Sequence, residues 1–179
     1  PTEGTLRVVY RVAGEGTKEF SEMKAGDTLE VMGPLGNGFT MKNEKAIIIG
    51  GGIGIPPMLE LAKQLDAEKT VVLGYRTSTF LKEEFEEVCD VKIAIEKYGV
   101  EGKVIYACGP MPMLKALAAY AEEHGMEAQI SLEERMACGI GACLGCICKS
   151  KTKDHHTNVN NTRICKDGPV FDAKEVVFS

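Results

Sequence analysis

Short apolar runs alternate with amphipathic segments through the middle of the chain. Runs rich in β-branched residues predict strands, whereas apolar residues spaced three and four apart predict helices. The clearest helical pattern places Leu114, Leu117 and Ala121 on one face. We predict strands at 46–49, 71–75, 91–95, 103–107 and 128–132, and helices at 58–65, 82–88 and 111–124. Strands that alternate with helices are typical of a parallel, doubly wound α/β sheet.

The first part of the chain has a different pattern, that of a small β structure. Segments 6–12 and 28–32 are rich in β-branched or aromatic residues and predict strands. Between them, Thr17 follows a glycine turn and is placed to cap a short helix at 18–23. The first turn of such a helix has free N–H groups that suit a phosphate, although a plain capped turn also explains Gly16 and Thr17.

Two strands cannot close a barrel, so we expect only part of a β-barrel here. The sequence begins with Pro1 rather than Met, which agrees with a missing upstream portion. We divide the chain into a partial β-barrel at 1–43, an α/β domain at 44–132 and a cysteine-rich domain at 133–179.

A glycine-rich loop follows the first predicted strand of the sheet. Glycines in a strand–loop–helix unit let the backbone approach a pyrophosphate, and the helix N-terminus favours an anion. The match to G-x-G-x-x-G is incomplete, since Ile55 stands at the last position. A second loop follows the strand at 103–107 and would form the other wall of a nucleotide cleft. The residues expected at this site are Gly50, Gly51, Gly52, Gly54, Cys108, Gly109 and Pro110.

Two questions about this cleft stay open in the sequence. Cys108 could equally be a small buried core residue. No acidic residue accompanies Arg76 and Thr77 at the end of the second predicted strand, so the pattern is compatible with both NAD and NADP.

The cysteines give the most specific signal. Three of the seven follow C-x4-C-x2-C spacing and a fourth comes after a polar loop, which is the spacing of a plant-type [2Fe–2S] ligand set. Glycines at 139, 141 and 145 would let the backbone turn sharply around such a cluster. The predicted ligands are Cys138, Cys143, Cys146 and Cys165.

The remaining cysteines fit less well. Cys148 stands two residues after Cys146 and falls outside this spacing, so we leave it out. Cys89 is predicted to lie in the core. Four thiolates also suit a structural zinc ion, but zinc motifs favour paired C-x2-C knuckles and the chain has one such pair. The segment 149–163 is polar without apolar periodicity and predicts an exposed loop, with His155 and His156 at its tip. A metal role for these histidines is the alternative, but no partner ligand stands near them in the sequence.

Charge and composition exclude some classes of binding partner. The net charge is −5 and no block of basic residues is present, so we expect neither nucleic acid nor a membrane surface as a partner. The longest apolar run, 46–59, contains glycines and two prolines and is too short to span a bilayer. Clustered cysteines and no leading signal peptide indicate a cytoplasmic protein.

Together these segments resemble the electron-transfer subunit of NAD-linked, class 1B bacterial dihydroorotate dehydrogenase, a family with a ferredoxin-reductase-like arrangement. The resemblance covers nearly the whole chain. The segments that carry it are 9–11, 16–17, 33–39, 50–54, 106–110, 138–146 and 165–171.

The resemblance implies a complete electron path. FAD would lie between the barrel and the nucleotide domain, where Val9, Tyr10 and Arg11 match the flavin-contacting strand and Gly16 and Thr17 match the pyrophosphate contact. A separate catalytic subunit with FMN would oxidise dihydroorotate, and electrons would pass through [2Fe–2S] and FAD to NAD. The family implies a heterotetramer of two subunits of each kind, acting in pyrimidine (UMP) biosynthesis.

Two alternatives remain. Small subunits of other NAD(P)H-linked flavin and iron–sulfur oxidoreductases, of the ferredoxin:NADP or sulfide dehydrogenase type, share the motif order. In those relatives the first cluster ligand is typically Asp, whereas Cys138 gives an all-cysteine set here. A non-catalytic, zinc-stabilised nucleotide-binding module is the alternative of another class.

Overall fold

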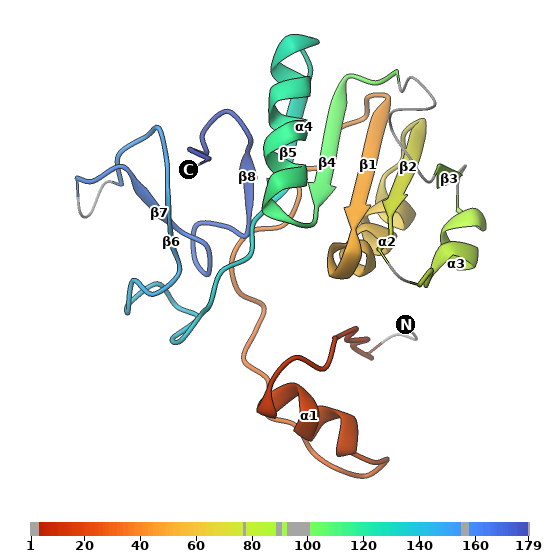
Figure 1. Ribbon diagram of the computed structural model, residues 1–179, viewed down its shortest axis with the longest axis vertical. Helices are drawn as coiled ribbons and strands as arrows, with labels where there is room; N and C mark the ends of the chain where they lie inside the picture. The colour runs from red at the N-terminus through yellow and green to blue at the C-terminus, as the bar shows by residue number, and fades with distance from the viewer. Residues whose placement is uncertain (1–3, 77, 89–90, 93–100, 155–157, 179) are drawn as a thin grey trace. The chain divides into compact units, whose positions relative to one another are not determined.

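The computed structural model describes residues 4–76, 78–88, 91–92, 101–154 and 158–178. The chain forms two compact units, Pro1–Pro34 and Leu35–Ser179, which are described separately (Figure 1). Within the described residues, no helix is both long enough and apolar enough to cross a membrane.

The unit Pro1–Pro34 is built around α1 (Glu15–Glu22). Thr17 does not precede the helix as predicted but lies in its first turn. Its Oγ1 accepts hydrogen bonds from the N–H groups of Ala13 (2.9 Å) and Gly14 (3.1 Å), which fixes the chain entering the helix. Tyr10 packs edge to face on Phe20, with ring centroids 5.8 Å apart.

The strands predicted at 6–12 and 28–32 are not observed among the described residues of this unit. Backbone hydrogen bonds instead close α1 and a turn in which the Asp27 N–H donates to the Lys24 carbonyl (3.0 Å). High β-propensity favours a strand only where a neighbouring strand supplies the other half of each hydrogen bond.

The second unit contains a six-stranded sheet with strand order β3-β2-β1-β4-β5-β8. Strands β1 to β5 are parallel, as the alternating pattern predicted, and β8 pairs antiparallel with β5. The bounds are β1 Ala46–Gly51, β2 Lys69–Gly74, β3 Val91–Lys92, β4 Val104–Cys108, β5 Glu127–Ser131 and β8 Val170–Asp172. The end of the strand predicted at 91–95 lies outside the described residues, as does Cys89.

Helices cover both faces of the sheet because β1 is apolar on both sides. Ile48 packs with the core that includes Met58 of α2 and Phe85 of α3. Ile47 packs with the opposite core, which includes Leu114 of α4. The bounds are a 3₁₀ turn at Gly52–Gly54, α2 Ile55–Gln64, α3 Lys82–Glu86 and α4 Met111–Glu123.

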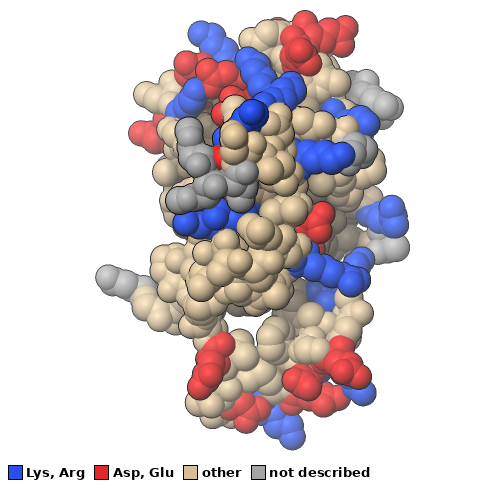
Figure 2. All heavy atoms as spheres, turned by 90° about the vertical axis from the view of Figure 1, so that its left-hand side faces the viewer, with Lys and Arg blue, Asp and Glu red and all other residues tan. Residues whose placement is uncertain are grey.

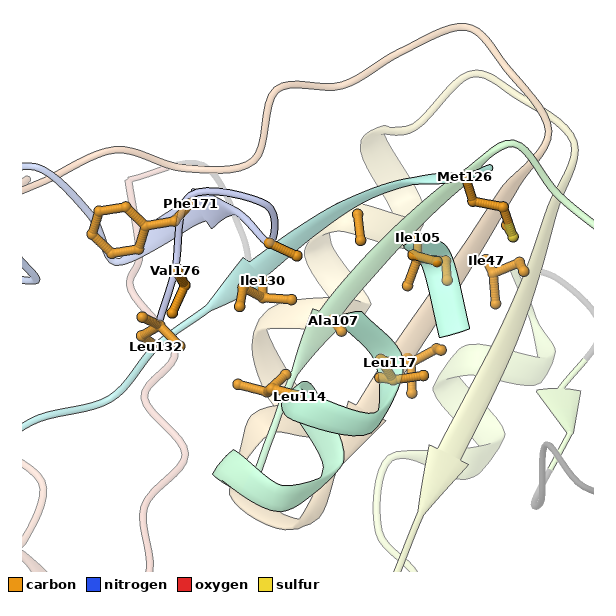
Figure 3. Packing of buried hydrophobic residues seen from close by; sticks show 14 of the residues in the cluster. Ile47, Ile105, Ala107, Leu114, Leu117, Met126, Ile130, Leu132, Phe171 and Val176 are labelled. Carbon is orange, nitrogen blue, oxygen red and sulfur yellow. The ribbon is translucent and has the colours of Figure 1, made fainter. Parts of the chain in front are cut away.

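The core on the α4 side continues into the cysteine-rich segment. Phe171 packs in the same buried cluster as Leu114 and Ile130 (Figure 3). Cys146 and Cys165 belong to this cluster as well. The polar segment begins and ends in an antiparallel hairpin of β6 (Ile147–Lys149) and β7 (Asn161–Arg163). Beyond β8, Val176 forms a single antiparallel bridge with Ser150.

The segment before β1 is fastened across β4 and β5. The Tyr106 hydroxyl donates to the Thr40 carbonyl (3.2 Å) and accepts from the Lys42 N–H (2.9 Å). The Gln129 amide makes two hydrogen bonds to the Thr40 backbone, of 2.8 and 2.9 Å. These bonds hold the chain in place before it enters the sheet.

Candidate metal centre and nucleotide-binding cleft

The first three candidate ligands lie on a loop shaped by left-handed backbone conformations. Gly139 and Gly141 have φ of 69° and 80°, and Leu144 adopts φ of 58°. A β-carbon on Gly141 would lie 2.8 Å from Cδ of Lys166, so this glycine also permits the close approach of the Cys165 segment. The loop therefore coils tightly between its cysteines.

The structure brings the four predicted cysteines together as two pairs. The Cys143 N–H donates to Sγ of Cys138 (3.4 Å), and the two side chains are within hydrogen-bonding reach. The Cys165 N–H donates to Sγ of Cys146 (3.4 Å), and these side chains also meet. The second pair joins residues separated by 19 positions in the sequence.

The two pairs differ in burial and in electrostatics. Cys146 and Cys165 are only 2% and 5% exposed, whereas Cys143 is exposed and Cys138 half-buried. Hydrogen bonds from the backbone N–H groups of Cys143 and Ile140 lower the pKa of Cys138 to about 6, so its thiolate forms readily. Hydrogen bonding with Cys146 and burial raise the pKa of Cys165.

Cys148 has a different environment. It lies in β6, is half-buried and packs against the core on the α4 side. Burial, together with the nearby charge of Glu134, raises the pKa of Cys148 to about 11, so it stays a neutral thiol at pH 7. This placement agrees with leaving Cys148 out of the predicted ligand set. His155 and His156 lie outside the described residues.

The donor set fits an iron–sulfur group. All four cysteines are free thiols, and N–H groups already point at Sγ of Cys138, Cys143 and Cys146. Among the described residues, no three His, Cys, Asp or Glu side chains gather as they would around one ion. Two thiol pairs suit a group that takes two thiolates at each of two metal positions.

Exposed apolar side chains surround the cysteine loop. They are Met136, Ile140, Leu144 and Ile147. The face of the molecule on which β6 and β7 lie in Figure 1 has a broad area without charged side chains (Figure 2).

The predicted nucleotide residues come together at the carboxyl ends of β1 and β4. These strands are neighbours in the sheet although they are not consecutive in the chain, so their ends form a topological switch point. A β-carbon on Gly51 would lie 3.0 Å from Cδ of Pro110, and one on Gly109 would lie 3.0 Å from Cα of Gly51. The two loops pack directly on each other.

Gly52 differs from the glycines around it. It has φ of 54°, and a β-carbon built there meets nothing within 4 Å. Helix α2 begins just beyond, but Pro56 and Pro57 have no N–H to donate. An anion here would therefore bind chiefly to amides of the loop, aided by the helix dipole.

Cys108 ends β4 beside this loop and is half-buried. Burial raises the pKa of its thiol, which outweighs the opposing hydrogen bond with the Ser131 side chain. Ser131 is the partner of Cys108 in the β4–β5 register, so the contact follows from strand pairing.

The predicted flavin contacts all lie in the unit Pro1–Pro34. Gly16 and Thr17 occupy the first turn of α1, and a β-carbon on Gly16 would meet nothing within 4 Å. Val9 and Tyr10 are 36% and 39% exposed.

Sequence reasoning missed an ion pair that braces the fourth cysteine. Asp167 accepts from Nε of Arg163 (2.9 Å) and from its backbone N–H (2.9 Å). Burial alone would raise the pKa of Asp167, but the hydrogen bonds from Arg163 outweigh it and lower that pKa. The only sequence signal for this ion pair was that Arg163 and Asp167, of opposite charge, are four residues apart.

Comparison with known proteins identifies the family. Residues 133–177 match the family described as the iron–sulfur cluster binding domain of dihydroorotate dehydrogenase B. The chain is 44% identical to the dihydroorotate dehydrogenase B (NAD(+)) electron transfer subunit of Caldanaerobacter subterraneus subsp. tengcongensis, over 98% of this chain and 77% of that protein. The chain belongs to this family.

Other members are similar to a comparable extent. The electron transfer subunit of Fusobacterium nucleatum is 40% identical over 97% of this chain and 75% of its own length. Among solved structures, the NADH-dependent reduced ferredoxin-NADP oxidoreductase, described in connection with flavin-based electron bifurcation, aligns with a TM-score of 0.80. It is 28% identical, and the alignment covers 94% of this chain and 67% of that one.

Proposed function

We propose that this chain carries electrons between a dihydroorotate-oxidising catalytic subunit and NAD. The observation that carries the proposal is the arrangement of four free cysteines as two pairs, in a unit whose neighbouring strands β1 and β4 end side by side in glycine-containing loops. Family membership supports it, since the relatives are named as electron transfer subunits of dihydroorotate dehydrogenase B (NAD(+)).

Cys138, Cys143, Cys146 and Cys165 would hold a [2Fe–2S] cluster. The Cys138–Cys143 pair would bind one iron and the Cys146–Cys165 pair the other. N–H donors at the sulfurs stabilise added negative charge and so favour uptake of an electron. Burial of Cys146 and Cys165 keeps water from that side of the centre.

The nucleotide cleft would bind NAD through the loops after β1 and β4. The open position at Gly52 leaves room for a pyrophosphate, while Gly51, Gly54 and Gly109 allow the two loops to close on each other. Cys108 and Pro110 would line the far wall. Val9, Tyr10, Arg11, Gly16 and Thr17 would contact FAD in the N-terminal unit, as part of a flavin-binding barrel.

Three kinds of redox group serve different steps, because nicotinamide exchanges a hydride, a cluster exchanges single electrons, and a flavin does both. The chain's own residues bind and space these groups. The proposed domains are a partial flavin barrel at 1–43, a nicotinamide domain at 44–132 and a cluster domain at 133–179. The proposed assembly is a heterotetramer with two FMN-containing catalytic subunits, acting in pyrimidine biosynthesis in the cytoplasm.

Co-expression with a dihydroorotate dehydrogenase catalytic subunit tests this function. The complex of the full-length protein should contain iron and FAD and should reduce NAD with dihydroorotate, followed by the absorbance of NADH. A complex that holds iron and FAD but reduces NADP with ferredoxin instead would favour the ferredoxin:NADP type. A colourless protein with zinc and no iron would identify the zinc-stabilised module.

A further inference from the structure

Two segments separated by 130 residues meet beside the fourth cysteine. Nδ2 of Asn37 donates to the Asp167 carbonyl oxygen (3.1 Å), and the Asn37 N–H donates to the Gly168 carbonyl oxygen (2.5 Å). Asn37 also forms a backbone bridge with Pro169. One residue thus holds consecutive carbonyl groups of the segment that begins at Cys165.

Gly36 makes this contact possible. It has φ of 70°, and a β-carbon there would lie 3.0 Å from the carbonyl carbon of Gly168 and 3.0 Å from Cδ of Pro169. A side chain would therefore push the two segments apart. The backbone of Gly36 thus lies closer to Gly168 and Pro169 than any residue with a β-carbon could.

The segment that Asn37 holds is a tight turn. The N–H groups of Lys166, Asp167 and Gly168 all donate to the Arg163 carbonyl oxygen, at 3.2, 2.8 and 3.3 Å. On its other side, the Leu132 N–H donates to the Pro169 carbonyl oxygen (2.8 Å). The turn is therefore held internally by the Arg163 carbonyl group and externally by two residues, Leu132 and Asn37.

The orientation of Cys165 depends on this turn. Cys165 lies inside it, buried, with its N–H directed at Sγ of Cys146 (3.4 Å). Any rotation of the turn would change both the position of the Cys165 sulfur and the length of that N–H···S hydrogen bond.

We propose that Asn37 is a positioning residue for the metal centre. Asn37 holds the turn that follows Cys165, and this keeps the Cys165 N–H directed at Sγ of Cys146. The inference rests on the proposed function in that it takes Cys146 and Cys165 as cluster ligands. Hydrogen bonds to sulfur raise the reduction potential of an iron–sulfur cluster because they stabilise the added negative charge. Asn37 would therefore help to set that potential without touching the cluster.

Asn37→Asp and Asn37→Ala test the inference, with Asn43→Asp as matched control because Asn43 is an exposed asparagine before β1. Both Asn37 variants lose the side-chain donor. The Asp variant additionally places a carboxylate against the Asp167 carbonyl oxygen. We expect the midpoint potential of the cluster to fall in the order native, Asn37→Ala, Asn37→Asp, with a changed electron paramagnetic resonance spectrum and faster iron loss to a chelator.

Hydrogen exchange of the cluster-free protein gives a readout that needs no bound iron. Amides of the 163–168 segment should exchange faster in both Asn37 variants than in native protein, while Asn43→Asp should match native. A native protein that binds no iron would refute the proposed function, whereas the exchange result would still decide whether Asn37 holds the turn. Native exchange rates, potential and spectrum in both Asn37 variants would overturn the inference.

Discussion

The α-carbon of Gly54 packs directly against the backbone of Cys108. A β-carbon on Gly54 would lie 2.5 Å from the Cys108 carbonyl carbon and 2.7 Å from the Gly109 nitrogen. These atoms belong to backbone and cannot turn aside. The contact holds the loop after β1 against the loop after β4 and so fixes the spacing of the two loops proposed to bind the nucleotide.

Gly54→Ala should therefore destabilise the second unit. We expect a loss of about 2 kcal/mol in the free energy of unfolding, as for other overpacked sites, together with weaker NAD binding. Urea unfolding of the purified variant measures the loss. Gly74→Ala at the end of β2 is the control, because its β-carbon would make ordinary contacts of 3.7 and 3.9 Å. Equal stability of the two variants would contradict the packing argument.

Gly52→Glu should block NAD by charge and size rather than by clashing with protein. Space is open above Gly52, so the side chain fits, but its carboxylate would occupy the proposed pyrophosphate position. We expect at least about tenfold weaker NAD binding by calorimetry, or about 1.4 kcal/mol. Gly52→Ala imposes the same left-handed backbone strain without the charge, and it should retain more affinity than the Glu variant. Equal affinities of the two variants would place the pyrophosphate elsewhere.

Cys146→Ser should abolish a stable cluster, whereas Cys148→Ser should leave iron content unchanged. Cys146 faces Cys165, while Cys148 points into the hydrophobic core of the α4 side. Iron analysis and visible absorption after reconstitution distinguish the two variants. Native iron content in Cys146→Ser would refute the ligand assignment.

The cysteines of the cluster-free protein should react with iodoacetamide at different pH values. Cys138 has a pKa of about 6, so its thiolate is present at pH 7 and is lost as the pH falls through 6. Cys148, with a pKa of about 11, stays protonated throughout this range. Mass spectrometry after brief alkylation at pH 7 should find Cys138 modified well before Cys148. The reverse order would contradict the local hydrogen bonding at Cys138.

Thr17→Val should loosen the start of α1. The change keeps the shape of the side chain but removes the oxygen that accepts from Ala13 and Gly14. We expect a local loss of about 1 kcal/mol, seen as faster hydrogen exchange of the α1 amides. Thr28→Val, in the same unit, serves as the control and should leave this exchange unchanged.

The sequence predicted the sheet well because its central strands β1 and β4 are apolar on both faces. Strands β1 and β4 are short, nearly continuous apolar runs, a pattern typical of a parallel sheet covered by helices. Strand β8 was not assigned to this sheet, since three residues do not reveal which edge they join. The strands predicted at 6–12 and 28–32 were wrong for another reason. A segment of high β-propensity forms a strand only when a second strand pairs with it.

The candidate site was predictable where one short segment carries the chemistry. Spacing alone selected Cys138, Cys143 and Cys146. It could not reveal that Asn37 holds the turn beyond Cys165, because the two segments lie 130 residues apart and Asn37 belongs to no recognised ligand pattern. Such contacts arise from tertiary packing and carry no periodic signal.

The edge strand β8 determines which fragments of this protein have a fully paired sheet. Residues that follow the last cysteine cover the free edge of β5, pairing Ile130 with Phe171. A fragment cut after Leu132 would leave the hydrogen-bonding groups of β5 exposed, and exposed strand edges are templates for pairing with other chains. The excised α/β fragment should therefore self-associate, because in the whole chain the cysteine-rich segment covers this strand edge.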